Sequence, residues 1–257
     1  MAALFFIDVL KKQHSFVHGT SPRCHVKNGV RKPLFCSDKG DEKLFLEDQI
    51  VFLHSLKIVT KVFFRVTQVH GNHVYVLKDS SIPVSEVGLC EADAIITHIP
   101  DCPIVVLTAD CVPIIIYDPI KHVVGVVHAG RLGTQKRIFT NTVEALSREY
   151  GSKPKNLIVG MGPAIRGCCY ELDEPCALPF IKKSPFSSEF INKIGGNKFF
   201  LDLPKVNRFE GYEAGILMKN IYTDGPCTSC ENDRWYSYRR EGKTGRLITL
   251  AMLQSRE

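Results

Sequence analysis

The sequence has no long apolar run and no export signal. None of its segments approaches the roughly 18 consecutive apolar residues of a membrane-spanning helix. The apolar stretch at residues 1–10 is short, is followed by positive charge at Lys11 and Lys12 instead of being preceded by it, and lacks a small-residue cleavage site. We therefore expect no membrane association and a cytoplasmic location.

Several signatures of copper sites are missing as well. A multinuclear copper oxidase needs several His-X-His pairs, and the sequence contains none. Methionine, the long axial ligand of blue copper sites, occurs only four times and never near the candidate metal ligands described below. Copper is therefore possible but less favoured than zinc as a bound metal.

Internal repeats and low-complexity linkers are also absent, so residues 1–257 are expected to form one domain. Apolar runs alternate with helical periodicities, which predicts an α/β (α+β) fold: a single compact domain of mixed β-sheets flanked by helices. The predicted elements are strands at 104–108, 112–117, 123–127, 157–161 and 247–253, a hairpin joining 63–67 to 73–77 around Gly71-Asn72, helices at 134–150 and 212–222, and a helix-and-loop excursion at 173–197.

Cysteine, by contrast, is abundant. The ten cysteines are spread over a long chain without an export signal, so we expect most of them to be free thiols. Cys227 and Cys230 have C-x-x-C spacing, but with no second such pair in the sequence we expect neither a structural zinc cage nor a thioredoxin-type redox site. Adjacent Cys168 and Cys169 are interpreted as a packed thiol beside an exposed or active-site one.

The charge balance favours small anionic ligands over nucleic acid. The 33 basic and 27 acidic residues give a net charge of +6, and the basic residues are dispersed except at 131–137 and 234–246. Only the second of these segments interleaves basic residues with aromatic ones, as nucleic-acid-binding modules do. We expect no nucleic-acid partner.

Three residues are candidate ligands of one zinc ion. Cys111 and His128 each stand at an end of an apolar run, so two buried strands would deliver them to one end of a sheet, and His70 lies near the predicted hairpin turn. Catalytic zinc takes three such ligands and keeps one open position. The alternatives are a packed thiol with a core histidine, a metal arm made by His70 with His73, and a nucleophilic Cys111 using His128 and Asp110 without any metal.

A candidate anion site follows His128. Gly130, Arg131 and Gly133 precede a helix expected to begin near Thr134, which would offer flexible backbone, free N–H groups and a positive helix end. The alternative is an ordinary glycine-containing turn with solvated basic side chains. Further candidate anion ligands are Lys136, Arg137, Arg239, Arg240 and Arg246.

Taken together, several segments resemble one family, the laccase-domain or polyphenol-oxidoreductase-like proteins, which are also described as purine nucleoside phosphorylases. The resemblance spans nearly the whole chain in order. It is carried by HGTSPR (18–23), QVHG (68–71), EADAIIT (91–97), TADCVPIIIYD (108–118), GVVHAG (125–130), GPAIRGCCYEL (162–172), LDL with Asn207, and CT followed by YSYRREGKTGR (236–246).

The resemblance implies zinc bound by His70, Cys111 and His128. It further implies phosphorolysis of adenosine, inosine, guanosine and methylthioadenosine to the free base and the sugar 1-phosphate, together with hydrolytic deamination of adenosine. The partners would be a purine nucleoside and inorganic phosphate, and the protein a monomer or small homo-oligomer.

One departure from the family pattern concerns the anion site. The family usually continues HAG with Trp-Arg-Gly, whereas this chain has Arg131-Leu132-Gly133. If the usual arginine contacts phosphate, either Arg131 replaces it, Arg240 and Arg246 do so, or phosphorolysis is weakened. Tyr170 is a further candidate substrate-binding residue, and the general acid would be Tyr170, Asp110 or Glu171.

Three other functions stay open at this point. A cysteine-type amide hydrolase acting on cell-wall precursors would use Cys111 and His128 and would survive chelation. A non-catalytic, metal-stabilised binding protein would bind zinc and leave nucleosides intact. A copper polyphenol oxidase is the least favoured.

Overall fold

A six-stranded mixed sheet lies at the centre of the computed structural model, which describes residues 4–27, 30–35, 42–60, 62–183 and 187–255. The strand order is β13-β9-β7-β8-β5-β4. The strands are β4 (Val74–Leu77), β5 (Ala94–Thr97), β7 (Val112–Asp118), β8 (Val123–Ala129), β9 (Ile158–Met161) and β13 (Ile221–Tyr222).

Both faces of this sheet are buried. In β7, Ile114 and Ile116 belong to one apolar cluster, whereas Ile115 and Tyr117 belong to another, because successive side chains of a strand point to opposite faces. Every residue of β7 and β8 is buried. The sheet therefore needs a cover on each side, which explains why these strands are continuous apolar runs in the sequence.

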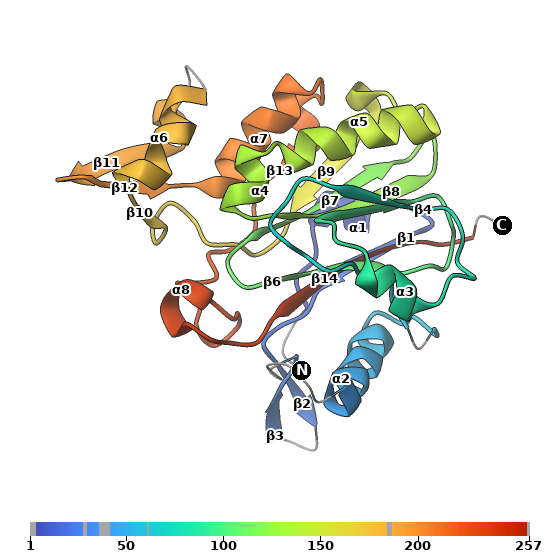
Figure 1. Cartoon of the computed structure of the whole chain (residues 1–257). Coiled ribbons are helices and arrows are strands. Elements are labelled where there is room, and N and C mark those ends of the chain that lie inside the picture. Colours follow the sequence, from blue (N-terminus) through green and yellow to red (C-terminus); the bar gives the residue numbers. More distant parts are fainter. Residues whose placement is uncertain (1–3, 28–29, 36–41, 61, 184–186, 256–257) are drawn as a thin grey trace.

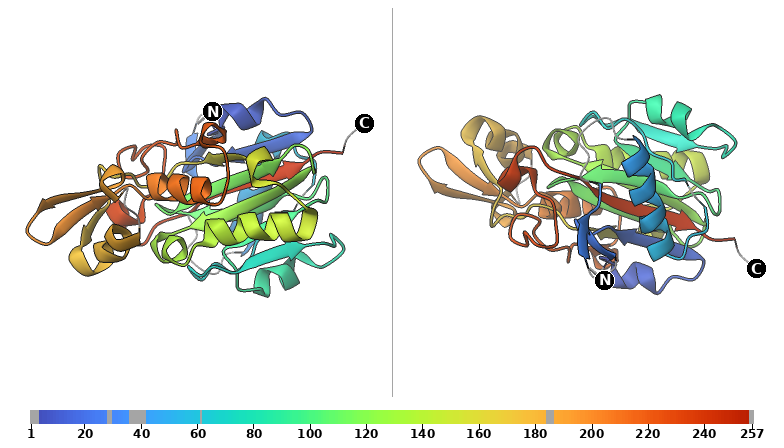
Figure 2. Two further views of the ribbon diagram at one scale, coloured as in Figure 1. Left: turned by 90° about the horizontal axis from the view of Figure 1, so that it is seen from above. Right: turned by 90° about the horizontal axis from the view of Figure 1, so that it is seen from below.

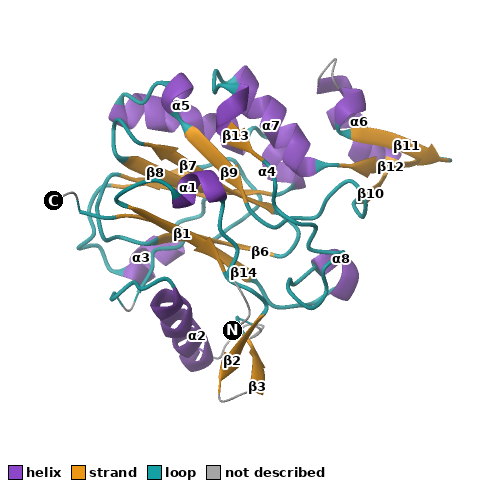
Figure 3. Cartoon of the chain, turned by 180° about the vertical axis from the view of Figure 1, so that it is seen from behind, coloured by secondary structure: helices purple, strands orange, loops and turns teal. Residues whose placement is uncertain are grey.

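A second, antiparallel sheet covers one face, and helices cover the other. The second sheet has the order β1-β14-β6, formed by β1 (Phe16–Thr20), β14 (Leu247–Leu253) and β6 (Ile104–Thr108). Helices α4 (Arg131–Gln135), α5 (Ile138–Tyr150) and α7 (Leu203–Glu213) lie on the opposite face, and α2 (Glu42–Ser55) packs on the outside of the second sheet (Figures 1 and 3). The layers are thus helix, sheet, sheet and helix.

A small lobe projects beside these layers. It contains β10 (Glu171–Asp173), α6 (Glu174–Lys183), β11 (Ile191–Gly195) and β12 (Lys198–Leu201), with the strands in the order β10-β12-β11 (Figure 2). The remaining elements are α1 (Asp8–Lys11), β2 (Cys24–Lys27), β3 (Val30–Pro33), α3 (Val84–Leu89) and α8 (Tyr238–Glu241). Between them lie the single-turn 3₁₀ helices at Pro154–Asn156, Ser187–Glu189 and Met218–Asn220.

Helix α5 shows how the sequence sets these elements. Phe139, Val143 and Leu146 recur at helical spacing and are buried against the six-stranded sheet. The helix ends at Gly151, which adopts φ +67°, a left-handed conformation that glycine reaches without steric cost. The predicted start at Thr134 is wrong, because Arg137, with φ +64°, separates the short α4 from α5.

Two other predicted elements are also wrong. Residues 63–67 and 73–77 form no hairpin: Phe64 bridges to Ile104, whereas β4 pairs in parallel with β5. The helix predicted at 212–222 is replaced by the end of α7, a break at Gly215 with φ +91°, a 3₁₀ turn and β13. The predicted strands at 104–108, 112–117, 123–127, 157–161 and 247–253 are confirmed within one residue at each end, except that β8 runs to Ala129.

The predicted fold class is confirmed: the chain is a mixed α/β single compact domain of several sheets and helices. The excursion at 173–197 contains the expected helix, but also the strand β11, which its weak alternation did not indicate. Within the described residues, no helix combines the length and the apolar character that crossing a membrane requires.

Candidate metal and substrate site

His70, Cys111 and His128 converge at one end of the central sheet. Antiparallel pairing of β7 with β8 sets Val112 opposite Ala129, which brings the neighbouring Cys111 and His128 together. His70 comes from the loop before β4, and its φ of +56° turns the chain toward them. The Cys111 Sγ lies 3.9 Å from His70 Nε2, and the possible ligand atoms of all three residues lie within 4.8 Å of one another.

Asp93 orients the two histidines. Its carboxylate accepts a hydrogen bond from His128 Nδ1 at 2.7 Å and others from the backbone N–H groups of His70 at 3.0 Å and Gly71 at 2.6 Å. Because Nδ1 of His128 is held by this carboxylate, Nε2 is the nitrogen left to bind a metal. Asp93 belongs to the EADAIIT segment, and its role was not predicted; an acidic residue in a segment shared with a metal-binding family was the available signal.

The donor set fits a zinc ion. With Zn–S near 2.3 Å and Zn–N near 2.0 Å, the sulfur–nitrogen edge of a tetrahedral site is about 3.6 Å long, close to the separation of Cys111 Sγ and His70 Nε2. Gly130 borders the site, and a Cβ built there would lie 2.9 Å from Cys111 Sγ and 2.9 Å from His70 Cδ2. The absence of a side chain at Gly130 therefore leaves room for these ligands to converge.

The charges of the ligands suit a metal. Burial raises the pKa of the Cys111 thiol, but the charge and hydrogen bond of His128, together with His70, outweigh it and bring the pKa to about 6. Burial lowers the pKa of His128, whereas Cys111 and Asp93 raise it, to about 9. A lowered thiol pKa favours the thiolate, which is the form of cysteine that binds a metal.

Tyr170 lies beside this group with two arginines. Burial raises the pKa of Tyr170, the positive charges of Arg131 and Arg239 lower it, and the Cys111 sulfur raises it, so the charges of all three groups act on the phenol. The Arg239 guanidinium lies over the Tyr170 ring, 5.0 Å from its centroid, and donates a hydrogen bond to the Glu171 carbonyl. These residues form the polar, positively charged border of the candidate metal site.

The other two predicted arginines have structural partners. Arg240 donates to the carbonyls of Thr228, Ser229 and Trp235 and pairs with Glu241. Arg246 donates to the carbonyls of Thr244 and Gly245. Both guanidinium groups hold the C-terminal loop together, so Arg239 is better placed than either to contact an anion.

The predicted glycine-rich turn is a short helix. Gly130 is the N-cap of α4 and Arg131 its first residue, whereas Gly133 is buried inside the helix, where a Cβ would lie 3.1 Å from the Gly71 carbonyl. Gly133 thus permits close packing of α4 on the loop that carries His70. Arg131 is half-buried and near Tyr170, while Leu132 is 42% exposed.

The three candidate general acids differ in their surroundings. Both carboxylate oxygens of Asp110 accept short hydrogen bonds, from the Thr228 hydroxyl and from the Arg239 N–H, each at 2.6 Å. Glu171 is half-buried and pairs with Lys198 at 3.0 Å. Within the part of the chain that the structure describes, the Tyr170 hydroxyl has no hydrogen-bond partner, so its proton is available for transfer.

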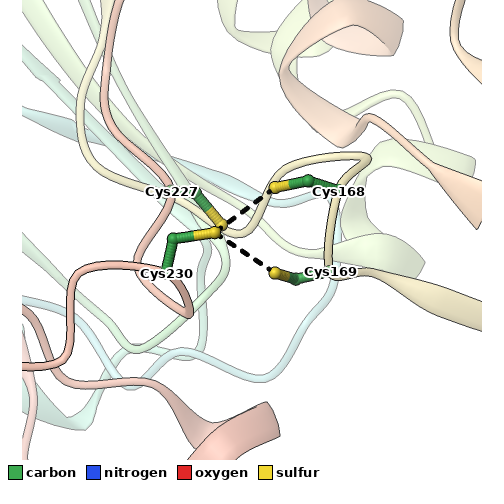
Figure 4. A group of neighbouring side chains, drawn as sticks. All are labelled: Cys168, Cys169, Cys227 and Cys230. Atoms are coloured by element: carbon green, nitrogen blue, oxygen red, sulfur yellow. Dashed lines mark hydrogen bonds between the residues drawn. The ribbon is translucent and has the colours of Figure 1, made fainter.

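The structure corrects two interpretations of the sequence. His73 turns away from the metal ligands, and its Nδ1 lies 2.9 Å from the Glu91 carbonyl, so no His-X-X-H arm forms. Cys227 and Cys230, for which no zinc cage was expected, have two further thiols beside them, because Cys168 and Cys169 both contact Cys230 (Figure 4).

A surface hollow of about 640 Å³ lies elsewhere, along α5 and the end of α7. Arg137, Glu144, Arg148 and Glu213 are among the residues lining it, and none of the candidate metal ligands borders it. Its lining has neither convergent ligands nor a nucleophile, so we place the functional site at His70, Cys111 and His128 and not in the hollow.

Comparison with known families agrees with this geometry. A family model described as multi-copper polyphenol oxidoreductase laccase matches residues 36–254. The chain belongs to this family. The match includes all three candidate ligands, Asp93, Tyr170 and the C-terminal arginines.

Several relatives that are similar in sequence to this chain are named as enzymes. Purine nucleoside phosphorylase YlmD of Bacillus subtilis is 35% identical over 164 residues, which are 63% of this chain and only 59% of that protein. Purine nucleoside phosphorylase of Deinococcus radiodurans is 33% identical over 234 residues, or 90% of this chain and 87% of the relative. Adenosine deaminase RL5, from an unknown prokaryotic organism, is 31% identical over 222 residues, covering 83% and 84%.

A solved structure shares the fold. Bacillus licheniformis hypothetical protein YfiH superimposes with a TM-score of 0.87 at 24% identity, covering 99% of this chain and 97% of the other. The two chains therefore share the same fold.

Proposed function

We propose that the protein is a zinc-dependent purine nucleoside phosphorylase with adenosine deaminase activity. The observation that carries the proposal is the convergence of His70, Cys111 and His128 beside Tyr170. Relatives named purine nucleoside phosphorylase and adenosine deaminase support the reaction class. The proposed substrates are adenosine, inosine, guanosine and methylthioadenosine, with inorganic phosphate as the second substrate of phosphorolysis.

The chain supplies the charge and orientation of the metal ligands. A zinc ion with these three ligands would supply a Lewis acid with one open coordination position. Cys111 is held as a thiolate by its histidine neighbours, and Asp93 fixes the ring of His128.

Arg131 and Arg239 are the proposed phosphate ligands. Both lie close to Tyr170, and Arg131 is the first residue of α4, so it replaces the arginine that the family usually carries one position later. Leu132, at the position where the family usually has arginine, is exposed and carries no charge. Gly130 and Gly133 would contribute by allowing close packing around Cys111, His70 and Gly71. Arg240 and Arg246 would contribute by stabilising the C-terminal loop to which they donate hydrogen bonds.

Tyr170 is the proposed general acid. Burial raises the pKa of its phenol, which favours the protonated form that a general acid needs. Asp110 instead holds the loop of Thr228 and the start of α8, so we assign it a positioning role.

The test is chromatography of the purified protein incubated with adenosine, with and without phosphate, alongside Cys111→Ala and with the zinc content of both measured. We expect adenine only when phosphate is present and inosine in either condition, and loss of both products with loss of zinc in the variant. Wild-type protein that carries zinc but forms neither product would overturn the nucleoside assignment.

A second candidate function rests on the thiolate–imidazolium pair. Cys111 with a pKa of about 6 beside His128 is also the arrangement of a nucleophilic cysteine and its base, as in an amide hydrolase acting on cell-wall precursors. Chelation distinguishes the two: amide hydrolysis would survive removal of zinc and be lost on alkylation. A non-catalytic metal-binding protein would show neither activity, and copper in the purified protein would favour the polyphenol oxidase alternative.

The cytoplasmic location and the monomeric or small homo-oligomeric state also belong to this proposal. A cytoplasmic compartment keeps thiols reduced, which suits a site that depends on a free Cys111. Cell fractionation and size-exclusion chromatography test the two statements, respectively.

A further inference from the structure

Four cysteine sulfur atoms gather on the side of the molecule next to the small lobe. They come from two loops, Cys168 and Cys169 before β10, and Cys227 and Cys230 before α8 (Figure 4). The Sγ of Cys230 lies 3.6 Å from that of Cys168 and 3.4 Å from that of Cys169, and all four sulfur atoms lie within 4.8 Å of one another.

These separations are those of one tetrahedral metal site. With Zn–S near 2.3 Å, the sulfur–sulfur edge of a ZnS₄ tetrahedron is about 3.8 Å, whereas a disulfide would bring two sulfurs to about 2.05 Å. An iron–sulfur cluster holds its cysteines farther apart, because inorganic sulfide and several irons lie between them. The group is therefore sized for a single ion.

The surroundings of Cys227 also suit a bound thiolate. The residue is buried, and the backbone groups of Arg166, Ser229 and Cys230 lie beside its sulfur. Backbone N–H groups directed at a cysteine sulfur stabilise its negative charge and fix its direction, as outer partners do around metal ligands. Cys168 and Cys230 are exposed, which gives an ion a route of entry.

The two loops also carry residues of the first site. Cys169 immediately precedes Tyr170, and Thr228, between the other two cysteines, donates its hydroxyl hydrogen bond to Asp110, the neighbour of Cys111. Asp110 in turn accepts from the backbone of Arg239. A bond between the loops at the cysteines would hold Tyr170 and Arg239 in place.

We propose that Cys168, Cys169, Cys227 and Cys230 bind a second Zn²⁺ ion, which has a structural role and fixes the border of the first site. Four thiolates with tetrahedral spacing select zinc among the common divalent ions, and the closed ligand set leaves no position for substrate. The proposal stands on the geometry of these loops and does not depend on the reaction catalysed at His70, Cys111 and His128.

The first test is metal stoichiometry. Protein purified without reductant or chelator is analysed for zinc, copper and iron by mass spectrometry, as wild type, Cys111→Ala, the double variant Cys168→Ser/Cys230→Ser, and the control Cys24→Ser, which removes a half-buried cysteine of β2 outside both groups. We expect two zinc ions per chain for wild type and the control, and one for each of the other two. A double variant with as much zinc as wild type would overturn the proposal.

A second measurement covers the case in which the double variant fails to fold. Cys111→Ala is reconstituted with Co²⁺, and its visible spectrum is recorded; a cobalt ion in four thiolates gives intense tetrahedral and sulfur-to-cobalt absorption that a site lacking sulfur does not. We expect this spectrum in Cys111→Ala at one cobalt per chain. Its absence, iron in place of zinc, or a Cys169–Cys230 crosslink found by peptide mass spectrometry would each reject the second zinc site.

Discussion

Asp93 and His128 form a short contact beside the candidate metal site, with 2.7 Å between Asp93 Oδ1 and His128 Nδ1 in a pair that is almost wholly buried. The same carboxylate accepts from the backbone of His70 and Gly71, so one side chain fixes two of the three ligands. A substitution at Asp93 therefore tests the orientation of the histidine ligands without removing any ligand.

Replacing Asp93 by Asn should weaken zinc binding without removing a ligand. The amide keeps the shape but loses the charge that stabilises His128, and outer partners of this kind change metal affinity about 10- to 100-fold. Competition with a chromophoric chelator measures the affinity. The matched control is Asp101→Asn, an exposed carboxylate that accepts from the Ser255 hydroxyl; equal losses in both variants would contradict the role assigned to Asp93.

Gly130→Ala should abolish metal binding while the fold survives. The added Cβ would lie 2.9 Å from both Cys111 Sγ and His70 Cδ2, closer than real contacts allow, so the ligands must separate. Zinc content and circular dichroism are measured together. Gly88→Ala serves as the control, because a Cβ at that helical glycine meets nothing within 4 Å and alanine favours the helix. A zinc-replete Gly130→Ala protein would show that the site is more adaptable than the contacts indicate.

Arg239→Gln should raise the KM for phosphate about tenfold or more, with a smaller effect on the KM for nucleoside. A hydrogen bond to a charged group contributes roughly 1.5–3 kcal/mol, and the Arg239 guanidinium lies over the Tyr170 ring, whereas Arg240 and Arg246 are bound to carbonyls of the C-terminal loop. Phosphorolysis and deamination are assayed in parallel, because only the first needs phosphate. Arg148→Gln, on the exposed face of α5, is the control. An equal fall in both reactions would indicate a general loss of structure around Tyr170.

The sequence predicted the strongly patterned parts of this molecule well. The apolar runs of β6 to β9 and β14 identify buried strands, and Gly151 marks the end of α5 because its left-handed conformation suits glycine. The convergence of His70, Cys111 and His128 was predicted from the ends of two such strands together with the family resemblance, and the structure brings the three together.

What the sequence could not predict depends on contacts between distant segments. The Gly71-Asn72 turn signal indicated a hairpin, but Gly71 instead donates to Asp93, and β4 finds a parallel partner in β5. The four-cysteine group was not predicted, because Cys168 and Cys169 do not have C-x-x-C spacing. Only the packing of the two loops brings them next to Cys227 and Cys230. The hydrogen bonds of the Arg240 side chain to three backbone carbonyls could not be predicted either, because such contacts produce no periodic pattern in the sequence.

His18 should make the protein less stable in mild acid. The ring is buried, stacks on Phe16, and accepts a hydrogen bond from the Ile7 N–H at Nε2, an interaction that protonation of this nitrogen would remove. Burial, and to a smaller extent the charge of Lys11, lower its pKa from 6.5 to about 4. The motif HGTSPR therefore contributes this histidine to the core, away from the metal ligands.

The sign of the effect follows from proton binding. Between pH 6.5 and pH 4 the unfolded chain binds a proton at His18 that the folded chain does not, so the free energy of unfolding falls as the pH is lowered through this range and levels off below it. At pH 5 the loss from His18 is about 2 kcal/mol relative to pH 8. Urea unfolding at pH 8 and pH 5 measures it for wild type and His18→Gln. The variant should lose about 2 kcal/mol less than wild type, whereas the exposed-residue control His54→Gln should match wild type; the same loss in all three proteins would place the acid sensitivity elsewhere.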